Sequence, residues 1–361
     1  MKLTGFKHFL ARLRWLIGQH KKRILIIGGA IILVAAATVT YFIVSRKPAD
    51  EAPPAAQVVE EPEPVKYYSP LTGRLVENEA STKQLVTSII IENSPDARPQ
   101  SGLKDSGVVF EAIAEGGITR FLVLYQQEKP QLIGPVRSLR MYYIDWLAAF
   151  DPSVAHIGGS AASLAEIRNG QHRDIDQFFN PVAYWRSTDR WAPHNVYTSF
   201  EKLDALNTAK GYTTSDVKSF SRVDGEPSET PTATVINVNI SSALYNSSYT
   251  YDPATNSYNR SLGGVPHMDR EAGQITPSVV IALRVNERTV LEDGYRQSID
   301  TIGSGAAVIF QNGIAQEVTW HKPDRASQIK FTDENGEDVP LVRGQTWISA
   351  VPNDTGSVSW Q

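Results

Sequence analysis

Acidic and basic side chains gather in a segment whose composition is otherwise typical of buried strands. Glu111, Glu115 and Arg120 lie in runs of β-branched and aromatic residues, and Asn93 and Arg98 follow the preceding run. Charged groups in buried strands need partners or water. One interpretation is a cleft in which Glu111 or Glu115 acts as an acid or a base. The alternative is a structural network of ion pairs, which the residue types alone favour.

A second group of candidates lies in the string GPVRSLR, just before a predicted helix. Arg137 and Arg140 are three residues apart, close enough to share a face, with Ser138 between them. Guanidinium groups and free helix N–H groups both favour an anion, so this segment could bind a phosphate or a carboxylate. Alternatively, both arginines pair with carboxylates, for which Glu111, Glu115 and Asp145 are the candidates.

The string VAHIGGSAASLAE predicts a strand, a glycine turn and a helix. Gly158 and Gly159 would let the backbone approach a ligand, and Ser160 stands where a helix N-cap or an exposed nucleophile would stand. The N-cap is the favoured interpretation, followed by anion binding. A serine nucleophile with His156 as its base comes third, because the final glycine of the nucleophile-elbow pattern is replaced by Ala162.

The string RWAPHN predicts a loop that exposes Arg190, His194 and Asn195. Loop histidines often transfer protons, although a surface histidine without a role is the interpretation that the residue type slightly favours. The sequence has no spacing of histidines and carboxylates typical of a metal site, so we expect neither a metal nor a cofactor. Gly303-Ser304-Gly305 is interpreted as a turn, because no helix signal or full glycine pattern follows it.

Composition narrows the chemistry further. The chain has 361 residues and no cysteine, which excludes disulfides, thiolate metal sites and a cysteine nucleophile. The first 47 residues contain nine lysines and arginines and no acidic residue, whereas the remaining 314 contain 26 basic and 39 acidic residues. So acidic a body is a poor match for the phosphate backbone, and we expect no nucleic-acid partner.

An apolar run at residues 24–44 is long enough to span a bilayer as a helix. Seven basic residues precede it and two follow it, so residues 1–23 are predicted to be cytoplasmic and the body extracytoplasmic. A cleaved signal peptide is the alternative. The segment 3–17 could form an interfacial helix on an anionic leaflet. Residues 45–67, rich in proline and glutamate, predict an extended linker.

The body is predicted to contain two domains. Residues 68–215 mix strands and helices, which predicts an α/β or α+β domain with a mixed sheet. Residues 216–232 are polar and turn-prone, typical of a linker. Residues 233–355 show short strands separated by turn signals, which predicts a mainly-β domain. In the first domain the predicted strands are 87–93, 107–115, 119–127 and 153–157, and the predicted helices are 139–150, 164–170 and 200–210.

Several strings together resemble the YerB-like family of bacterial envelope proteins, which consist of two successive domains of unknown function. The resemblance covers residues 68–355 and rests on SPLTG, NSPDARPQSGL, EGGITRFL, GPVRSLR, AHIGGS and RWAPHNVYTS, which begin at residues 69, 93, 115, 134, 155 and 190. It implies a membrane-tethered, outward-facing protein, and it suggests that the polar strings line one shared cleft. Typical members resemble lipoproteins anchored through a cysteine, which this chain lacks.

Two functions follow as hypotheses. The preferred one is a module that binds an anionic component of the cell envelope or an envelope protein. The other is an enzyme that modifies an envelope glycan or phosphate polymer, with Glu111, Glu115, His156 or His194 as acid–base residues and the arginines as orienting groups. A duller alternative is a purely structural interaction protein that uses the surface of the second domain.

Overall fold

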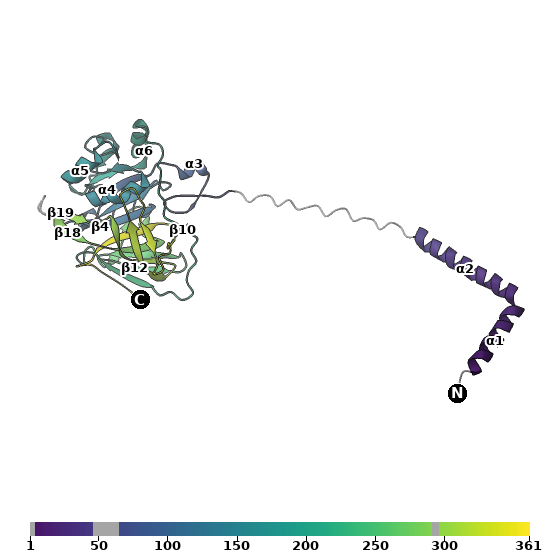
Figure 1. Ribbon diagram of the computed structural model, residues 1–361. Coiled ribbons are helices and arrows are strands. Elements are labelled where there is room, and N and C mark those ends of the chain that lie inside the picture. Colours follow the sequence, from purple (N-terminus) through teal and green to yellow (C-terminus); the bar gives the residue numbers. More distant parts are fainter. Residues whose placement is uncertain (1–3, 46–64, 291–295) are drawn as a thin grey trace. The chain divides into compact units, whose positions relative to one another are not determined.

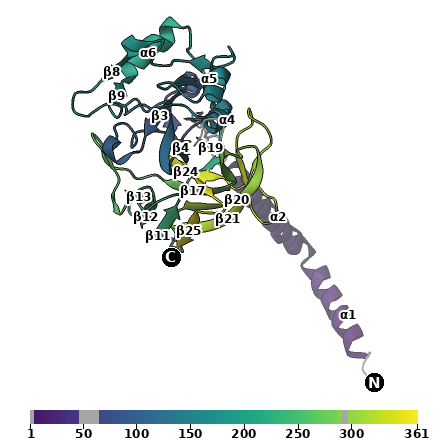
Figure 2. The same cartoon turned by 90° about the vertical axis from the view of Figure 1, so that its left-hand side faces the viewer.

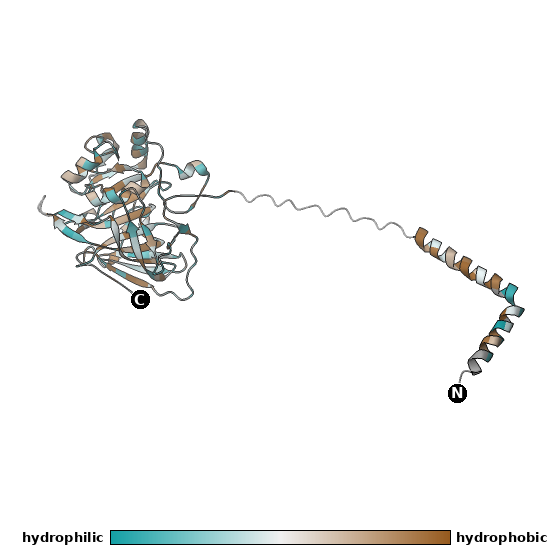
Figure 3. Cartoon of the chain, viewed as in Figure 1, coloured by the Kyte–Doolittle hydropathy of each residue, from teal (hydrophilic) through white to brown (hydrophobic). Residues whose placement is uncertain are grey.

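The structure is a computed structural model that describes residues 4–45, 65–290 and 296–361. The chain divides into two units, residues 1–64 and residues 65–361. In the first unit, α1 (Thr4–Gln19) precedes α2 (Lys21–Val44). Figure 1 shows both helices, and Figure 3 shows that α2 is coloured as hydrophobic along most of its length. The helix α2 is long and apolar enough to cross a membrane, and it contains the predicted span 24–44. Most of the predicted linker, residues 46–64, lies outside the described residues.

The second unit is built on a sheet that has 12 strands among the described residues. The main path of this sheet runs β22-β21-β20-β17-β24-β4-β5-β3-β6-β7. The bounds are β3 (Thr87–Glu92), β4 (Val108–Glu115), β5 (Ile118–Tyr125), β6 (Ser153–Ala155), β7 (Arg173–Asp174), β17 (Val279–Val285), β20 (Gly303–Gln311), β21 (Ile314–Lys322), β22 (Lys330–Thr332) and β24 (Thr346–Pro352). The hairpin of β18 (Glu287–Val290) and β19 (Arg296–Ile299) joins it beside β4.

Strands from both predicted domains share this sheet. Near the end of the chain, β24 lies parallel to β4 over the pairs from Thr346–Val108 to Ser349–Glu111. A second junction forms where β10 (Arg222–Val223), inside the predicted linker, pairs with β23 (Leu341–Val342). The central strands are buried on both faces, which is why their sequences are almost continuously apolar.

The two faces of the sheet have different covers. On one face, α4 (Met141–Leu147) packs Trp146 against Phe110, with stacked rings 5.2 Å apart. On the other face lies a five-stranded sheet, β14-β13-β12-β11-β25. Its bounds are β11 (Val235–Asn239), β12 (Ser247–Asp252), β13 (Ser257–Leu262), β14 (Val265–Pro266) and β25 (Ser357–Trp360). Both covers are labelled in Figure 2. The mixed α/β first part and the strand-rich second part confirm the predicted fold class.

Short elements complete the body. The helices are α3 (Glu79–Thr82), α5 (Ala161–Ile167) and α6 (Phe200–Ala209), with 3-10 turns at Pro95–Ala97, Ala148–Phe150 and Pro181–Ala183. The small strand pairs are β1 (Tyr67–Tyr68) with β2 (Leu75–Val76), β8 (Tyr184–Arg186) with β9 (Val196–Thr198), and β15 (Met268–Asp269) with β16 (Gly273–Gln274).

Some predicted boundaries are wrong for identifiable reasons. The helix predicted at 164–170 is α5, which begins three residues earlier because Ser160 caps it. The strand predicted at 153–157 ends at Ala155. The turn predicted at 303–305 is the first part of β20, paired with β21. Gly305 is needed there because a Cβ would lie 2.7 Å from the indole nitrogen of Trp320.

Candidate functional site

Glu115 is the centre of a charged cluster at the end of β4, next to a register shift in the β4–β5 pairing. Its carboxylate accepts hydrogen bonds from Arg140, with Nη2 at 2.6 Å and Nε at 3.0 Å from Oε2, and from Arg120. Burial alone would raise the pKa of Glu115, but the charges and hydrogen bonds of both arginines lower it below its usual value. The carboxyl is therefore ionised and is a poor general acid.

Glu92, at the end of β3, is the centre of a second cluster. Its Oε1 accepts from His194 Nδ1 at 2.9 Å and from Ser94 Oγ at 3.1 Å, and Arg137 Nε lies 3.1 Å from the same oxygen. Arg140 thus pairs with Glu115, as the ion-pair alternative predicted, whereas the partner of Arg137 is a carboxylate that this alternative did not name. The segment from Arg137 to Arg140 links the two clusters, and the Ser138 carbonyl accepts from Arg120.

Glu111 is fully buried and belongs to a third group of contacts. Its Oε2 accepts from Arg260 Nη2 at 2.7 Å and from Trp347 Nε1 at 3.0 Å, and its Oε1 accepts from Thr119 at 3.0 Å. Asn93, also fully buried, donates to Thr119 and accepts from Arg98 Nε. Neither Glu111 nor Asn93 can touch a ligand in this structure, so both support the fold around the charged clusters.

The glycine turn in the string VAHIGGSAASLAE leads into the N-cap of α5. Ser160 Oγ accepts from the Ser163 amide at 3.3 Å and donates to Ser163 Oγ at 2.9 Å, which confirms the predicted N-cap. His156 is buried, with Nδ1 2.8 Å from the Gly158 carbonyl and Nε2 3.0 Å from Asp174. Since both ring nitrogens are engaged there, the interpretation of His156 as a base for Ser160 is wrong. Gly159 is required by packing, because a Cβ would lie 2.6 Å from Ser163 Oγ.

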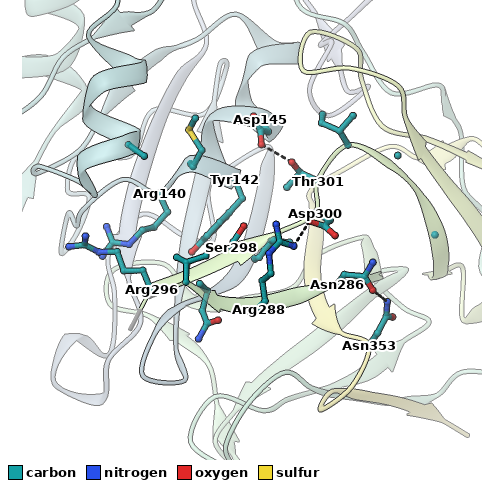
Figure 4. Close-up of a pocket in the computed structure, with 18 of the residues that line it drawn as sticks. Arg140, Tyr142, Asp145, Asn286, Arg288, Arg296, Ser298, Asp300, Thr301 and Asn353 are labelled. Carbon is teal, nitrogen blue, oxygen red and sulfur yellow. Dashed lines mark hydrogen bonds and ion pairs between the residues drawn. The ribbon is translucent and has the colours of Figure 1, made fainter. Parts of the chain in front are cut away.

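A cavity of about 600 Å³ lies beside the Glu115 cluster, between α4, the start of α5 and the β18–β19 hairpin (Figure 4). Among the described residues it is lined by four arginines and two aspartates, so positive side chains are in excess: Arg140, Arg284, Arg288, Arg296, Asp145 and Asp300. We name it the arginine pocket. Tyr142 and the hydroxyl-bearing residues Ser160, Ser298 and Thr301 add polar groups to its wall.

Carboxylates already hold part of the positive charge of the arginine pocket, because Arg140 is bound by Glu115. Arg284 donates to two neutral acceptors, the carbonyl oxygens of Gly356 and Asn353. Arg288 pairs with Asp300 at 2.8 Å, but both side chains are about half exposed. Asp145 is already held by Arg325, which lies outside the pocket lining, at 2.8 Å. The guanidinium of Arg284, held by neutral acceptors, and that of Arg288, whose carboxylate partner is open to solvent, therefore favour an anion at this wall.

A second cavity, of about 680 Å³, lies beside the Glu92 cluster. Its lining includes Arg98, Arg190 and His194 and shares no residue with the arginine pocket. Asn195 stands behind it and donates to the carbonyl oxygens of Ser187 and Arg190. The candidate side chains thus divide between two pockets and the core instead of lining one shared cleft.

Arg284, Arg288 and Arg296 were not among the predicted site residues, because they lie within or between short predicted strands of the second domain and no motif joins them. A signal was present, since Asp293-Gly294 between two polar and apolar runs is typical of a hairpin. Arg260 was also absent from the predicted site residues, although its spacing of two residues from Tyr258 and from Leu262 places all three on the same buried face of β13. Among the described residues, no three His, Asp or Glu side chains are grouped as metal ligands would be.

Comparisons with known proteins identify relatives of this chain. Two family models match it, "Protein of unknown function (DUF3048) N-terminal domain" at residues 71–213 and "Protein of unknown function (DUF3048) C-terminal domain" at residues 236–348. The chain is 31% identical over 301 residues to the protein named "Putative lipoprotein YerB" of Bacillus subtilis (strain 168), covering 81% of this chain and 89% of that protein. It is also similar to the crystal structure of YerB protein from Bacillus subtilis, with a TM-score of 0.73, 30% identity and coverage of 81% of this chain and 100% of that one.

Proposed function

The chain belongs to the DUF3048 family of two-domain YerB-like proteins, and we propose that it is a membrane-anchored extracytoplasmic module that binds an anionic component of the cell envelope. The family descriptions supply no reaction, so the proposal rests on this chain's own residues. The observation that carries it is the arginine pocket, an excess of guanidinium groups on a body that is acidic as a whole.

The proposed location follows from α2 and the charges around it. Seven basic residues precede the apolar run and two follow it, which favours a cytoplasmic N-terminus and an extracytoplasmic body. The Bacillus relative is named as a lipoprotein, a class that is held at the membrane by lipid attached to a cysteine. This chain has no cysteine, so an uncleaved helix would replace the lipid as the tether while the location of the body stays the same.

The proposed ligand carries phosphate or carboxylate groups, because both match the planar donor pattern of arginine. Arg284 and Arg288 come from β17 and β18, and Arg140 from the first-domain side, so a bound ligand would touch both family domains. A pocket of about 600 Å³ is in the range that accommodates a small ligand or one repeat of a polymer.

An envelope-modifying enzyme is the second candidate function, and one observation favours it. Of the four acid–base candidates, Glu111 and His156 are buried and Glu115 is ionised between two arginines. Only His194 combines an orienting carboxylate with a ring that lines a pocket. An enzyme would therefore have to use His194, and turnover that is independent of His194 would contradict this alternative.

The experiment for the binding proposal is calorimetry on the full chain in detergent micelles. The probes are a glycerol phosphate oligomer, a muropeptide and inorganic phosphate, and the variant is Arg288→Ala. The control is Lys218→Ala, which removes one exposed, paired positive charge outside the pocket. We expect at least one polymeric probe to bind and its Kd to rise about tenfold in Arg288→Ala alone. If no probe binds, or if both variants bind like the parent, the proposal is wrong.

A further inference from the structure

The cavity beside the Glu92 cluster is a second candidate binding site, separate from the arginine pocket. Its lining includes Asp96, Arg98, Arg190, Trp191, His194 and Arg270, and we name it the tryptophan pocket. Three stretches that are far apart in the sequence supply these residues: the 3-10 turn after β3, the loop between β8 and β9, and the turn between β15 and β16. The pocket is therefore formed only when these three stretches are brought together by the fold.

Two arginines of the tryptophan pocket are fixed by neutral acceptors. Arg190 donates to the carbonyl oxygens of Asp96 at 2.9 Å, of Arg98 at 3.2 Å and of Pro99. Arg98 donates to Asn93, with Nε 3.1 Å from Oδ1 and Nη2 2.9 Å from the carbonyl oxygen. Because these partners are uncharged, the positive charge of both guanidinium groups remains available to a ligand.

His194 is oriented from behind. Its Nδ1 lies 2.9 Å from Glu92 Oε1, a buried carboxylate oxygen that Arg137 also contacts. When Nδ1 is the hydrogen-bonded nitrogen, Nε2 is the ring atom available to a ligand. The nearest carboxylate to Nε2 is that of Asp96 at 3.9 Å, beyond hydrogen-bond distance. The imidazole thus presents a fixed polar atom to the pocket.

Trp191 offers a flat apolar surface next to these polar groups. The residue is 91% exposed, and its carbonyl oxygen accepts from the His194 amide at 3.0 Å, which ties the two residues into one turn. Asp96 and Asp189, whose side chains are 82% and 59% exposed, place carboxylates beside the arginines, and Asp189 accepts from Arg270 at 3.0 Å. An exposed indole surrounded by both donors and acceptors is an amphipathic surface.

We infer that the tryptophan pocket binds a saccharide that carries an anionic group. The C–H face of a sugar ring is apolar and can stack on Trp191, and its hydroxyl groups both donate and accept, which matches interleaved carboxylates and guanidinium groups. A purely apolar ligand would leave these groups desolvated and unpaired. A nucleobase would stack as well, but it has fewer hydroxyl groups than a sugar ring to pair with these carboxylates and guanidinium groups. Arg270 is paired with Asp189, which leaves Arg98 and Arg190, both held by neutral acceptors, against one further aspartate, Asp96; this favours an acidic sugar over a neutral one.

The test is a calorimetric titration of the full chain in detergent micelles. The probes are a glucuronate-containing oligosaccharide and N-acetylglucosamine 6-phosphate, which separate a sugar carboxylate from a sugar phosphate. The comparison probes are neutral chitotetraose, inorganic phosphate and AMP. The variant is Trp191→Ala, and Val182→Ala is the matched control because Val182 is also an exposed apolar residue, at 82%, outside the pocket lining.

We expect at least one acidic saccharide to bind more tightly than chitotetraose and inorganic phosphate, with a Kd that rises tenfold or more in Trp191→Ala and is unchanged in Val182→Ala. Arg288→Ala should leave this Kd unchanged, which distinguishes the tryptophan pocket from the arginine pocket. The inference is overturned if no saccharide binds, if Trp191→Ala binds like the parent, or if inorganic phosphate or AMP binds as tightly as the acidic sugars.

Discussion

Replacing Glu111 by glutamine should destabilise the body strongly, because it leaves a buried charge without its counter-ion. Glu111 and Arg260 are both fully buried and are joined at 2.7 Å across the interface between the central sheet and the five-stranded sheet. Glutamine keeps the shape of the side chain, but its single carbonyl oxygen can accept from either Trp347 or Thr119 and not from both, and it cannot neutralise the guanidinium. Breaking a buried pair on one side costs about 3–5 kcal/mol.

The measurement is urea unfolding of the full chain in detergent micelles, monitored through tryptophan fluorescence. The matched control is Glu317→Gln on β21, where the glutamate is exposed and the expected change is within about 0.5 kcal/mol. A double-mutant cycle with Arg260→Met isolates the pair. The double variant should cost clearly less than the two single variants together, since it removes both buried charges.

The same experiment separates the structural role of Glu111 from a catalytic one. Catalytic groups are often held at a cost to the fold, so their neutral variants tend to be as stable as the parent or more stable. A loss of less than about 1 kcal/mol for Glu111→Gln, or additive effects in the cycle, would refute the counter-ion argument and return Glu111 to the list of acid–base candidates.

Three further outcomes follow from the structure. Burial raises the pKa of Glu287 from 4.5 to about 7, so the folded state keeps this proton to a higher pH than the unfolded chain does. The free energy of unfolding should therefore fall by about 1–2 kcal/mol as the pH rises from 4.5 to 7, a value reduced because the carboxyl is only partly buried. The urea midpoints of Glu287→Gln should lack this fall. Ser160→Ala should cost about 1 kcal/mol in thermal unfolding through the lost N-cap; an unchanged unfolding midpoint would contradict the capping role. Gly134→Ala should lower the yield of folded protein in size-exclusion chromatography, because Gly134 has φ +152° and a Cβ would lie 2.8 Å from the Val196 carbonyl oxygen; a normal elution profile and urea midpoint would contradict this.

Local patterns in the sequence are sufficient to predict many of the elements. The run at 24–44 predicts α2 because a bilayer-length apolar helix has an unmistakable composition, and TSIIIE predicts β3 because β-branched residues favour extended backbone. The N-cap at Ser160 is equally local, since the hydroxyl and the amide it bonds are three residues apart. Each of these inferences depends only on neighbours along the chain.

The candidate site required the tertiary structure, because its partners are far apart along the chain. Arg260 reaches Glu111 across 149 residues, and His194 reaches Glu92 across 102 residues. The arginine pocket exists because the β18–β19 hairpin joins the sheet beside β4, where Arg296 lies opposite Glu115. Residue types alone indicated charges that must be paired or hydrated. Which arginines are neutralised by carboxylates and which face a cavity is decided by strand order and register, and these depend on contacts that no local pattern encodes.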